Sequence, residues 1–195
     1  DGHWRTWEFT NLLGEDVQGA TVGIVGMGRI GQAFARRARG FDMRILYHSR
    51  SRHPEIETEL GAEFTSLPEL LAQSDFVSLH VPLTEKTKGM LGEAEFGLMK
   101  PTAILINTAR GAVVEIDALL AALKTGLIRY AALDVTDPEP LPHTHELYRL
   151  PNVIILPHIG SATRSTRNKM AILAVDNLIA GLEGKPLPKA VHRKA

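Results

Sequence analysis

The sequence contains no cysteine and no hydrophobic run long enough to cross a membrane. The lack of cysteine excludes disulfides, thiol catalysis and cysteine-ligated zinc, and it suits a reducing compartment, so we expect a cytoplasmic protein. A membrane-spanning helix needs about 20 consecutive apolar residues. An excess of charge is also missing, because 22 Lys and Arg balance 22 Asp and Glu. This balance gives no electrostatic reason to expect nucleic acid or an anionic membrane surface as a partner.

The 195 residues are 44% hydrophobic, which is ample for a buried core. Short aliphatic and β-branched runs alternate with segments of helical periodicity. The runs typical of strands are 21–25, 44–47, 76–81, 103–107, 130–135 and 153–156. The expected helices are 29–39, 54–60, 67–73, 93–99, 115–125 and a long final one over about 161–183. This alternation predicts an α/β fold with a doubly wound, Rossmann-like parallel sheet and a long C-terminal helix.

Some helix ends are marked by single residues. Ser66 and Glu69 have the spacing of a capping box, and Gly126 marks a C-terminal stop. The last helix is closed by Gly184 and carries an apolar stripe that we expect to pack in the core. The residues of this stripe are Met170, Leu173, Ala174 and Leu178.

A glycine-rich turn joins the first expected strand to the first expected helix. It reads Gly26-Met27-Gly28-Arg29-Ile30-Gly31, the G-x-G-x-x-G pattern of a dinucleotide-binding turn in its proper context. Gly26 permits the turn, Gly28 lets the backbone approach a pyrophosphate, and Gly31 lets the helix pack closely on the strand. Phosphates would then lie at the positive end of that helix. A glycine turn without a ligand is the weaker alternative.

Three polar residues follow later strands, at the edge where such a sheet binds ligands. Arg110 follows 103–107, Glu139 stands between two prolines after 130–135, and His158 follows 153–156. Each residue alone is more simply explained as an ion pair, a solvated acid or a packed histidine. Together they suit carbonyl reduction, in which Arg110 binds a carboxylate, His158 donates a proton and Glu139 keeps His158 protonated, while a nicotinamide delivers hydride.

Four ordered motifs carry a family resemblance over essentially the whole chain. They are Val22 to Gly31, Ile106-Asn107-Thr108-Ala109-Arg110-Gly111, Leu133-Asp134-Val135 with Pro138-Glu139-Pro140, and Leu156-Pro157-His158-Ile159-Gly160-Ser161-Ala162-Thr163. In these motifs the chain resembles the D-isomer-specific 2-hydroxyacid dehydrogenases, and within them it is most similar to the glyoxylate/hydroxypyruvate reductases.

The resemblance implies roles for individual residues. Arg110 is then the substrate-binding arginine, Glu139 the orienting acid and His158 the general acid/base. Further positions are implied to contact the cofactor: Arg29 and Ile30 at the pyrophosphate, Pro82 and Thr108 along the cleft, Asp134 at the carboxamide, and Gly160 and Ser161 near the nicotinamide. The substrate stays open among glyoxylate, hydroxypyruvate and related 2-oxo acids.

The end of the second expected strand bears on the choice of cofactor. NAD-preferring enzymes carry an acid there for the ribose 2′-hydroxyl, whereas this chain has Ser49, Arg50 and Arg52. A hydroxyl and two guanidiniums suit a 2′-phosphate, so we predict a preference for NADPH over NADH. The alternative is that both arginines are exposed loop charges that still admit NADH.

The resemblance also predicts the domain organisation. We expect an inter-domain and dimer-contact segment at 1–16 containing Trp4 and Trp7, a cofactor domain at 17–187, and a tail at 188–195 directed toward a substrate domain. The chain begins without methionine and reaches the glycine turn within thirty residues, so we expect a fragment of a longer enzyme. We expect the longer protein to be a homodimer and the fragment alone to bind cofactor but to be inactive or nearly so.

Other functions fit the sequence less well. The nearest is a non-catalytic NAD(P)(H)-sensing corepressor of the same superfamily, which the basic loop at Arg50 disfavours. A metal site at His143, His145 and Glu146 lacks a further clustered ligand. Ser161 has no G-x-S-x-G elbow, and His80 is expected to be packed rather than catalytic.

Overall fold

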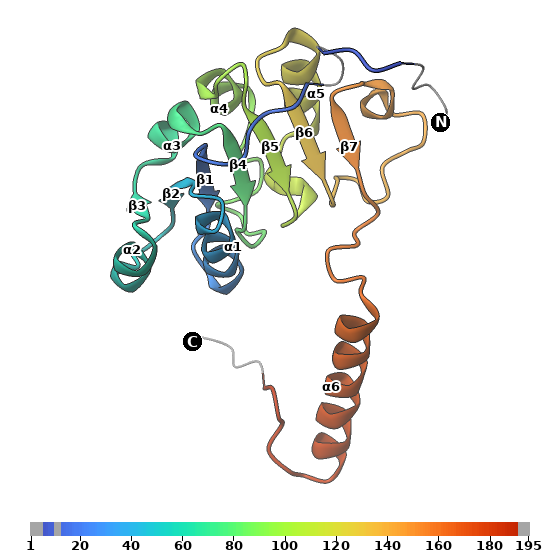
Figure 1. Ribbon diagram of the computed structural model, residues 1–195. Helices are drawn as coiled ribbons and strands as arrows, with labels where there is room; N and C mark the ends of the chain where they lie inside the picture. Colours follow the sequence, from blue (N-terminus) through green and yellow to red (C-terminus); the bar gives the residue numbers. More distant parts are fainter. Residues whose placement is uncertain (1–5, 10–12, 191–195) are drawn as a thin grey trace. The chain divides into compact units, whose positions relative to one another are not determined.

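A computed structural model describes residues 6–9 and 13–190 of the chain (Figure 1). The chain divides into two compact units, Asp1–Leu156 and Pro157–Ala195. Unit 1 contains a sheet with helices on its faces, and unit 2 contains one long helix. Trp4, which we expect at a subunit contact, lies outside the described residues.

Unit 1 is built on a seven-stranded parallel sheet with the order β3-β2-β1-β4-β5-β6-β7. The strands are β1 Thr21–Val25, β2 Arg44–His48, β3 Glu63–Phe64, β4 Phe76–Leu79, β5 Ile104–Asn107, β6 Tyr130–Leu133 and β7 Val153–Ile155. The six predicted strands are confirmed, most of them one or two residues shorter than expected. β3 was missed because it has two residues, both exposed, at the edge of the sheet. The strand order reverses between β1 and β4, which places a ligand-binding crevice at their carboxyl ends.

The predicted helices are also confirmed. They are α1 Arg29–Arg39, α2 Pro54–Leu60, α3 Leu67–Gln73, α4 Glu93–Leu98, α5 Ile116–Thr125 and α6 Arg164–Leu182, with short 3-10 turns η1 Gly111–Val113 and η2 Glu146–Arg149. The Ser66 side chain accepts from the Glu69 amide, and the Glu69 carboxylate accepts from the Ser66 amide, which is the predicted capping box. Gly126 ends α5 in the left-handed region at φ 74°.

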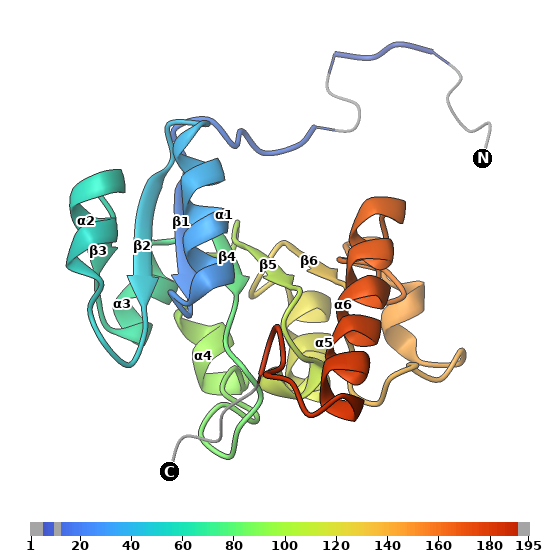
Figure 2. The ribbon, with the colours of Figure 1, turned by 90° about the horizontal axis from the view of Figure 1, so that it is seen from below.

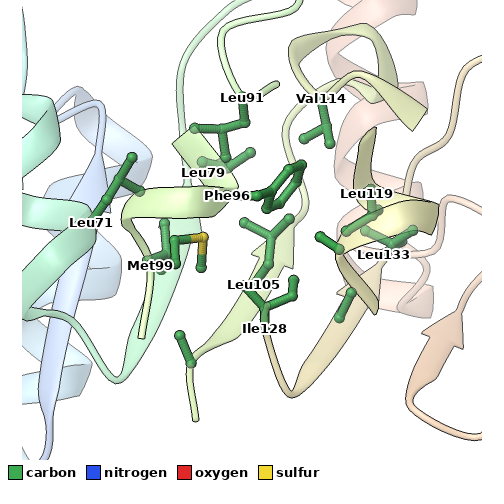
Figure 3. Packing of buried hydrophobic residues seen from close by; sticks show 14 of the residues in the cluster. Leu71, Leu79, Leu91, Phe96, Met99, Leu105, Val114, Leu119, Ile128 and Leu133 are labelled. Carbon is green, nitrogen blue, oxygen red and sulfur yellow. The ribbon is translucent and has the colours of Figure 1, made fainter. Parts of the chain in front are cut away.

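Two hydrophobic clusters make up the core of unit 1. The larger packs α3, α4 and α5, which lie next to one another in Figure 2, against β4, β5 and β6. Figure 3 shows its centre, where Phe96 of α4 lies among Leu105 of β5 and Leu119 of α5. The smaller cluster packs α1 and α2 against β1 and β2 and includes the fully buried Tyr47. At β1 and β2 helices thus cover both faces of the sheet, α1 on one and α3 on the other, as a parallel sheet requires. Farther along the sheet, Ile154 of β7 is 63% exposed.

Unit 2 holds α6, whose first turn is capped by Thr163, with the Thr166 amide donating to its hydroxyl at 3.1 Å. The helix therefore begins three residues later than predicted. Met170, Leu173 and Leu178 are 39–63% exposed. The described part of unit 2 by itself leaves much of this stripe uncovered, and helical periodicity alone does not say what an apolar face contacts, so its packing in a core stays a prediction. None of the described helices is both long enough and apolar enough to cross a membrane.

The segment before β1 exposes two aromatic side chains of unit 1. Trp7 is 74% exposed, Phe9 is 83% exposed, and their rings meet edge to face with centroids 6.2 Å apart. Exposed aromatic residues are typical of interfaces. The homodimer contact through 1–16 stays a prediction.

Candidate active site

The glycine turn after β1 is shaped by two close backbone approaches. Gly26 has φ 102°, and a Cβ added there would lie 2.8 Å from the carbonyl carbon and oxygen of His80. A Cβ added to Gly31 would overlap the carbonyl oxygen of Gly26. Only glycine fits either position, so the turn is bound tightly between α1 and the loop after β4.

The beginning of α1 is open at the same turn. Its N-cap is Gly28, no side chain caps it, and its first turn contains no acidic residue. A Cβ added to Gly28 would meet nothing within 4 Å. The helix therefore presents backbone N–H groups and the positive end of its dipole where an anionic ligand can approach the backbone directly.

A cleft of about 480 Å³ lies beside this turn. Its lining brings together six residues predicted from the sequence, namely Gly28, Arg29, Ile30, Pro82, Thr108 and Arg110. It also includes four residues not predicted as binding residues: His80, Val81, Leu83 and Ala109. Most of these are apolar, so their side chains carried no chemical signal. Only their place directly after β4 and β5, beside the point where the strand order reverses, could have identified them.

His80 combines packing with a place in the cleft wall. Its Nε2 lies 2.9 Å from the hydroxyl of Ser78, and its ring lies 5.1 Å from that of Phe34. Burial lowers the pKa of His80 to about 4, so the ring is neutral near pH 7. The prediction that His80 is packed is confirmed.

Arg110 stands on a loop that buried contacts hold in place. The Asn107 side chain donates to the carbonyl of Arg110 at 3.0 Å and accepts from the amide of Ala109 at 3.0 Å. A Cβ added to Gly111 would overlap the backbone of Thr136, so this loop lies directly against the one that follows β6. Asn107 was missed as a positioning residue because a polar residue at a strand end has many ordinary explanations.

The loop after β6 carries the two predicted acids of unit 1. Asp134 is buried, and its amide donates to the carbonyl of Asn107 at 2.9 Å. Glu139 is exposed, and the Thr136 hydroxyl donates to the carbonyl of Pro138 at 2.8 Å just before it. Arg110 and Glu139 therefore follow neighbouring strands, on loops that touch at Gly111 and Thr136.

His158, Gly160 and Ser161 belong to unit 2, whereas Arg110 and Glu139 belong to unit 1. The assembly of Arg110, Glu139 and His158 into one catalytic set therefore stays a prediction. His158 is exposed and has φ 54°, in the left-handed region that residues other than glycine rarely adopt. Such strained positions cluster at functional sites, which is a reason to examine His158 by mutation.

The basic loop after β2 differs from the prediction in one respect. The guanidinium of Arg52 is held by the carboxylate of Glu57 through two hydrogen bonds, at 3.1 Å from Nε and 2.6 Å from Nη2. The Ser49 hydroxyl donates to the carbonyl of Ser51. Arg50 is exposed and forms no ion pair with any residue in 6–9 or 13–190.

The residues of the alternative metal site have other partners. The His145 ring caps η2 by accepting from the Leu147 amide at 3.2 Å, and Glu146 forms an ion pair with Lys124. Over the described part of the chain, no three His, Asp or Glu side chains gather as metal ligands would.

Comparison with known proteins adds an independent finding. The family model described as "D-isomer specific 2-hydroxyacid dehydrogenase, NAD binding domain" matches residues 1–160. A glyoxylate reductase from Thermococcus litoralis is 53% identical over 196 residues, and one from Thermococcus onnurineus is 55% identical over 197 residues. These matches cover 98% and 99% of this chain, and the chain spans 59% of the length of each relative.

A solved structure agrees in fold with unit 1 and the long helix. The crystal structure of the TT0316 protein from Thermus thermophilus matches with a TM-score of 0.92 and 54% sequence identity. The match covers 98% of this chain and 60% of that protein.

Proposed function

Because this chain belongs to the D-isomer-specific 2-hydroxyacid dehydrogenase family, we propose that it is the cofactor-binding part of an NADPH-preferring reductase. Its substrates would be small 2-oxo acids such as glyoxylate and hydroxypyruvate, which are reduced to 2-hydroxy acids. The observation that carries the proposal is the glycine turn, which leaves an open helix N-terminus beside the cleft that contains Arg110.

The residues at the cleft fit a dinucleotide. Gly28 leaves room for a pyrophosphate at the beginning of α1, where the amides of Arg29 and Ile30 can donate to it. Pro82 and Thr108, which line the same cleft, would lie along the cofactor. Asp134 would accept a hydrogen bond from the nicotinamide carboxamide. Gly160 and Ser161 would contact the nicotinamide. When bound, the reduced nicotinamide supplies the hydride.

The reaction also needs groups that hold the substrate and move a proton. Arg110 would bind the substrate carboxylate with two parallel hydrogen bonds and polarise the neighbouring carbonyl. His158 would donate a proton to the carbonyl oxygen, and Glu139 would keep the imidazole protonated and oriented. The buried Asn107 would fix the loop from which Arg110 reaches the substrate.

The preference for NADPH would come from the loop after β2. Ser49 and Arg50 stand where an NAD-binding acid is missing, and the Arg50 guanidinium has no competing carboxylate among the described residues. Arg52 is engaged by Glu57, so Arg50 carries the main share of 2′-phosphate binding.

Calorimetric titration of this chain with NADPH and with NADH, at one salt concentration, tests the proposal. We expect tighter binding of NADPH, and in Arg50→Ala a loss of about tenfold in NADPH affinity, as for one charge-assisted contact. Arg39→Ala is the control, because it removes the same charge from the far end of α1. Equal or tighter binding of NADH would contradict the NADPH preference. Binding of neither would contradict the view that this chain holds the cofactor by itself.

The proposed reaction is followed separately by the loss of NADPH absorbance on addition of glyoxylate or hydroxypyruvate to the longer protein. Oxidation of NADPH that depends on the 2-oxo acid would support the proposal. Cofactor binding without any such oxidation would instead favour a sensing role.

A further inference from the structure

The two arginines of the loop after β2 have different surroundings. Arg52 donates from Nε and Nη2 to both carboxylate oxygens of Glu57, in the two-bond arrangement that suits a guanidinium. Its guanidinium carbon also lies 5.7 Å from the centre of the Phe64 ring. A 2′-phosphate that recruits Arg52 must therefore compete with a carboxylate that already holds it.

Glu57 is itself fixed by the core of unit 1. The hydroxyl of the fully buried Tyr47 donates to its Oε1 at 2.6 Å and accepts from the amide of His53 at 2.8 Å. The Glu57 side chain is 19% exposed although its partner Arg52 is 64% exposed. Hydrogen bonds from Arg52 and then Tyr47 lower the pKa of Glu57, so it is charged at neutral pH.

A second ion pair on the same helix shows what is particular to Glu57. Glu59 binds Arg36 of α1 with equally good geometry, at 2.7 and 2.8 Å, but both side chains are 46% exposed. Arg36 lies within α1, whereas Arg52 lies two residues from Arg50 on the loop that would receive the 2′-phosphate. The two carboxylates therefore differ in which arginine they neutralise.

We propose that Glu57 sets the strength of the preference for NADPH, by binding Arg52 in competition with the 2′-phosphate of the cofactor. Glu57 is a positioning residue in this account, since it acts through Arg52. The inference rests on the proposed function, because it assumes that NADPH binds at the loop after β2. Tyr47 contacts Glu57, and Phe64 contacts both Arg52 and Tyr47. The pairing of Arg52 with Glu57 is therefore held by residues of β2 and β3 and not only by the loop.

The test is Glu57→Gln, which removes the charge but keeps an oxygen that can accept from Tyr47. The measured quantity is the ratio of the NADH and NADPH dissociation constants of this chain, from calorimetry at one salt concentration. We expect the dissociation constant of NADH divided by that of NADPH to rise about tenfold, which is the effect of one additional hydrogen bond between charged groups. A general loss of structure would weaken both cofactors together and would leave the ratio unchanged.

Glu59→Gln is the matched control, since it makes the same substitution two residues away and releases Arg36 instead. A shift of the same size in both variants would overturn the proposal, because it would reduce the effect to a change in net charge. The double variant Glu57→Gln with Arg52→Ala should lose the gain. Retention of the gain without Arg52 would also overturn the proposal.

The result separates the inference from the proposed function. If the unaltered chain prefers NADPH in an Arg50-dependent way but Glu57→Gln leaves the ratio unchanged, only the role of Glu57 fails. If the unaltered chain does not prefer NADPH, the proposed binding of the 2′-phosphate by the loop after β2 is contradicted, and with it the role of Glu57.

Discussion

Two neighbouring regions at the carboxyl edge of the sheet are built in different ways. The cleft at β1, β4 and β5 is shaped by backbone packed against backbone, at Gly26, Gly31 and Gly111. The loop after β2 is shaped by side chains, through the hydrogen bonds of Glu57 with Arg52 and Tyr47. Backbone contacts do not change with a neighbouring charge, whereas ion pairs can exchange partners. We therefore expect the cleft to hold any dinucleotide and the loop to discriminate between them.

The largest effect is expected where the backbone contact is closest. Gly31→Ala forces a methyl group onto the Gly26 carbonyl and should lower the free energy of unfolding by about 3 kcal/mol, with loss of binding of both cofactors. Gly28→Ala is the control, because open space surrounds that position and its stability should change by less than about 0.5 kcal/mol. Urea unfolding and calorimetry measure both quantities. Equal stability of the two variants would show that the backbone contact does not shape the cleft.

An effect that grows only as the pH falls is expected from His80, whose protonation makes the stability of the chain depend on pH. Its pKa is about 4 in the folded chain, against 6.5 ordinarily, so the unfolded chain binds more protons between these values. The free energy of unfolding should therefore fall as pH drops from 6.5 toward 4, by a total of about 3 kcal/mol.

This contribution is measured as the difference between the chain and His80→Gln, which does not titrate, in urea unfolding across the same pH range. The difference removes the carboxylates, which titrate in both proteins. If both proteins lose stability equally between pH 6.5 and 4, burial does not hold His80 neutral.

The smallest effect is expected in the loop after β2. Tyr47→Phe removes the hydroxyl that binds Glu57 and His53 and should lower the free energy of unfolding by about 1 kcal/mol. The affinity for NADPH should rise relative to the affinity for NADH, because Glu57 then holds Arg52 less firmly. An equal weakening of both cofactors would instead show that the loop and the cleft are not independent.

The fold was largely predictable from the sequence, and the exceptions are instructive. Period and composition identify strands of three or more residues and capped helices, but the two-residue β3 has neither a period nor a burial pattern. The stripe of Met170, Leu173 and Leu178 has the right spacing for a core helix, but the described part of unit 2 by itself leaves much of it uncovered. Spacing reports that a helix has an apolar face, and it does not report what covers that face.

The site was predictable to the extent that backbone geometry requires particular residues. Gly26 and Gly31 could be assigned roles because only glycine tolerates that conformation at Gly26 and that close approach at Gly31. His80 was not assigned to the site, because its place in the cleft wall depends on packing against Phe34, which is far away in the sequence. Asn107 was not assigned to the site, because its hydrogen bond to Arg110 matters only once the fold places the Arg110 loop at the cleft.

By itself, the sequence determined the parallel sheet, the order of its elements and the dinucleotide turn, since these depend on local periodicity and on the sterics of single residues. Only the tertiary structure decided that Arg52 belongs to Glu57 while Arg50 does not, although both are arginines of one short loop. The reason is that ion pairing depends on distances between side chains from different elements. Here the buried hydroxyl of Tyr47 on β2 and the position of α2 fix the one carboxylate that Arg52 reaches.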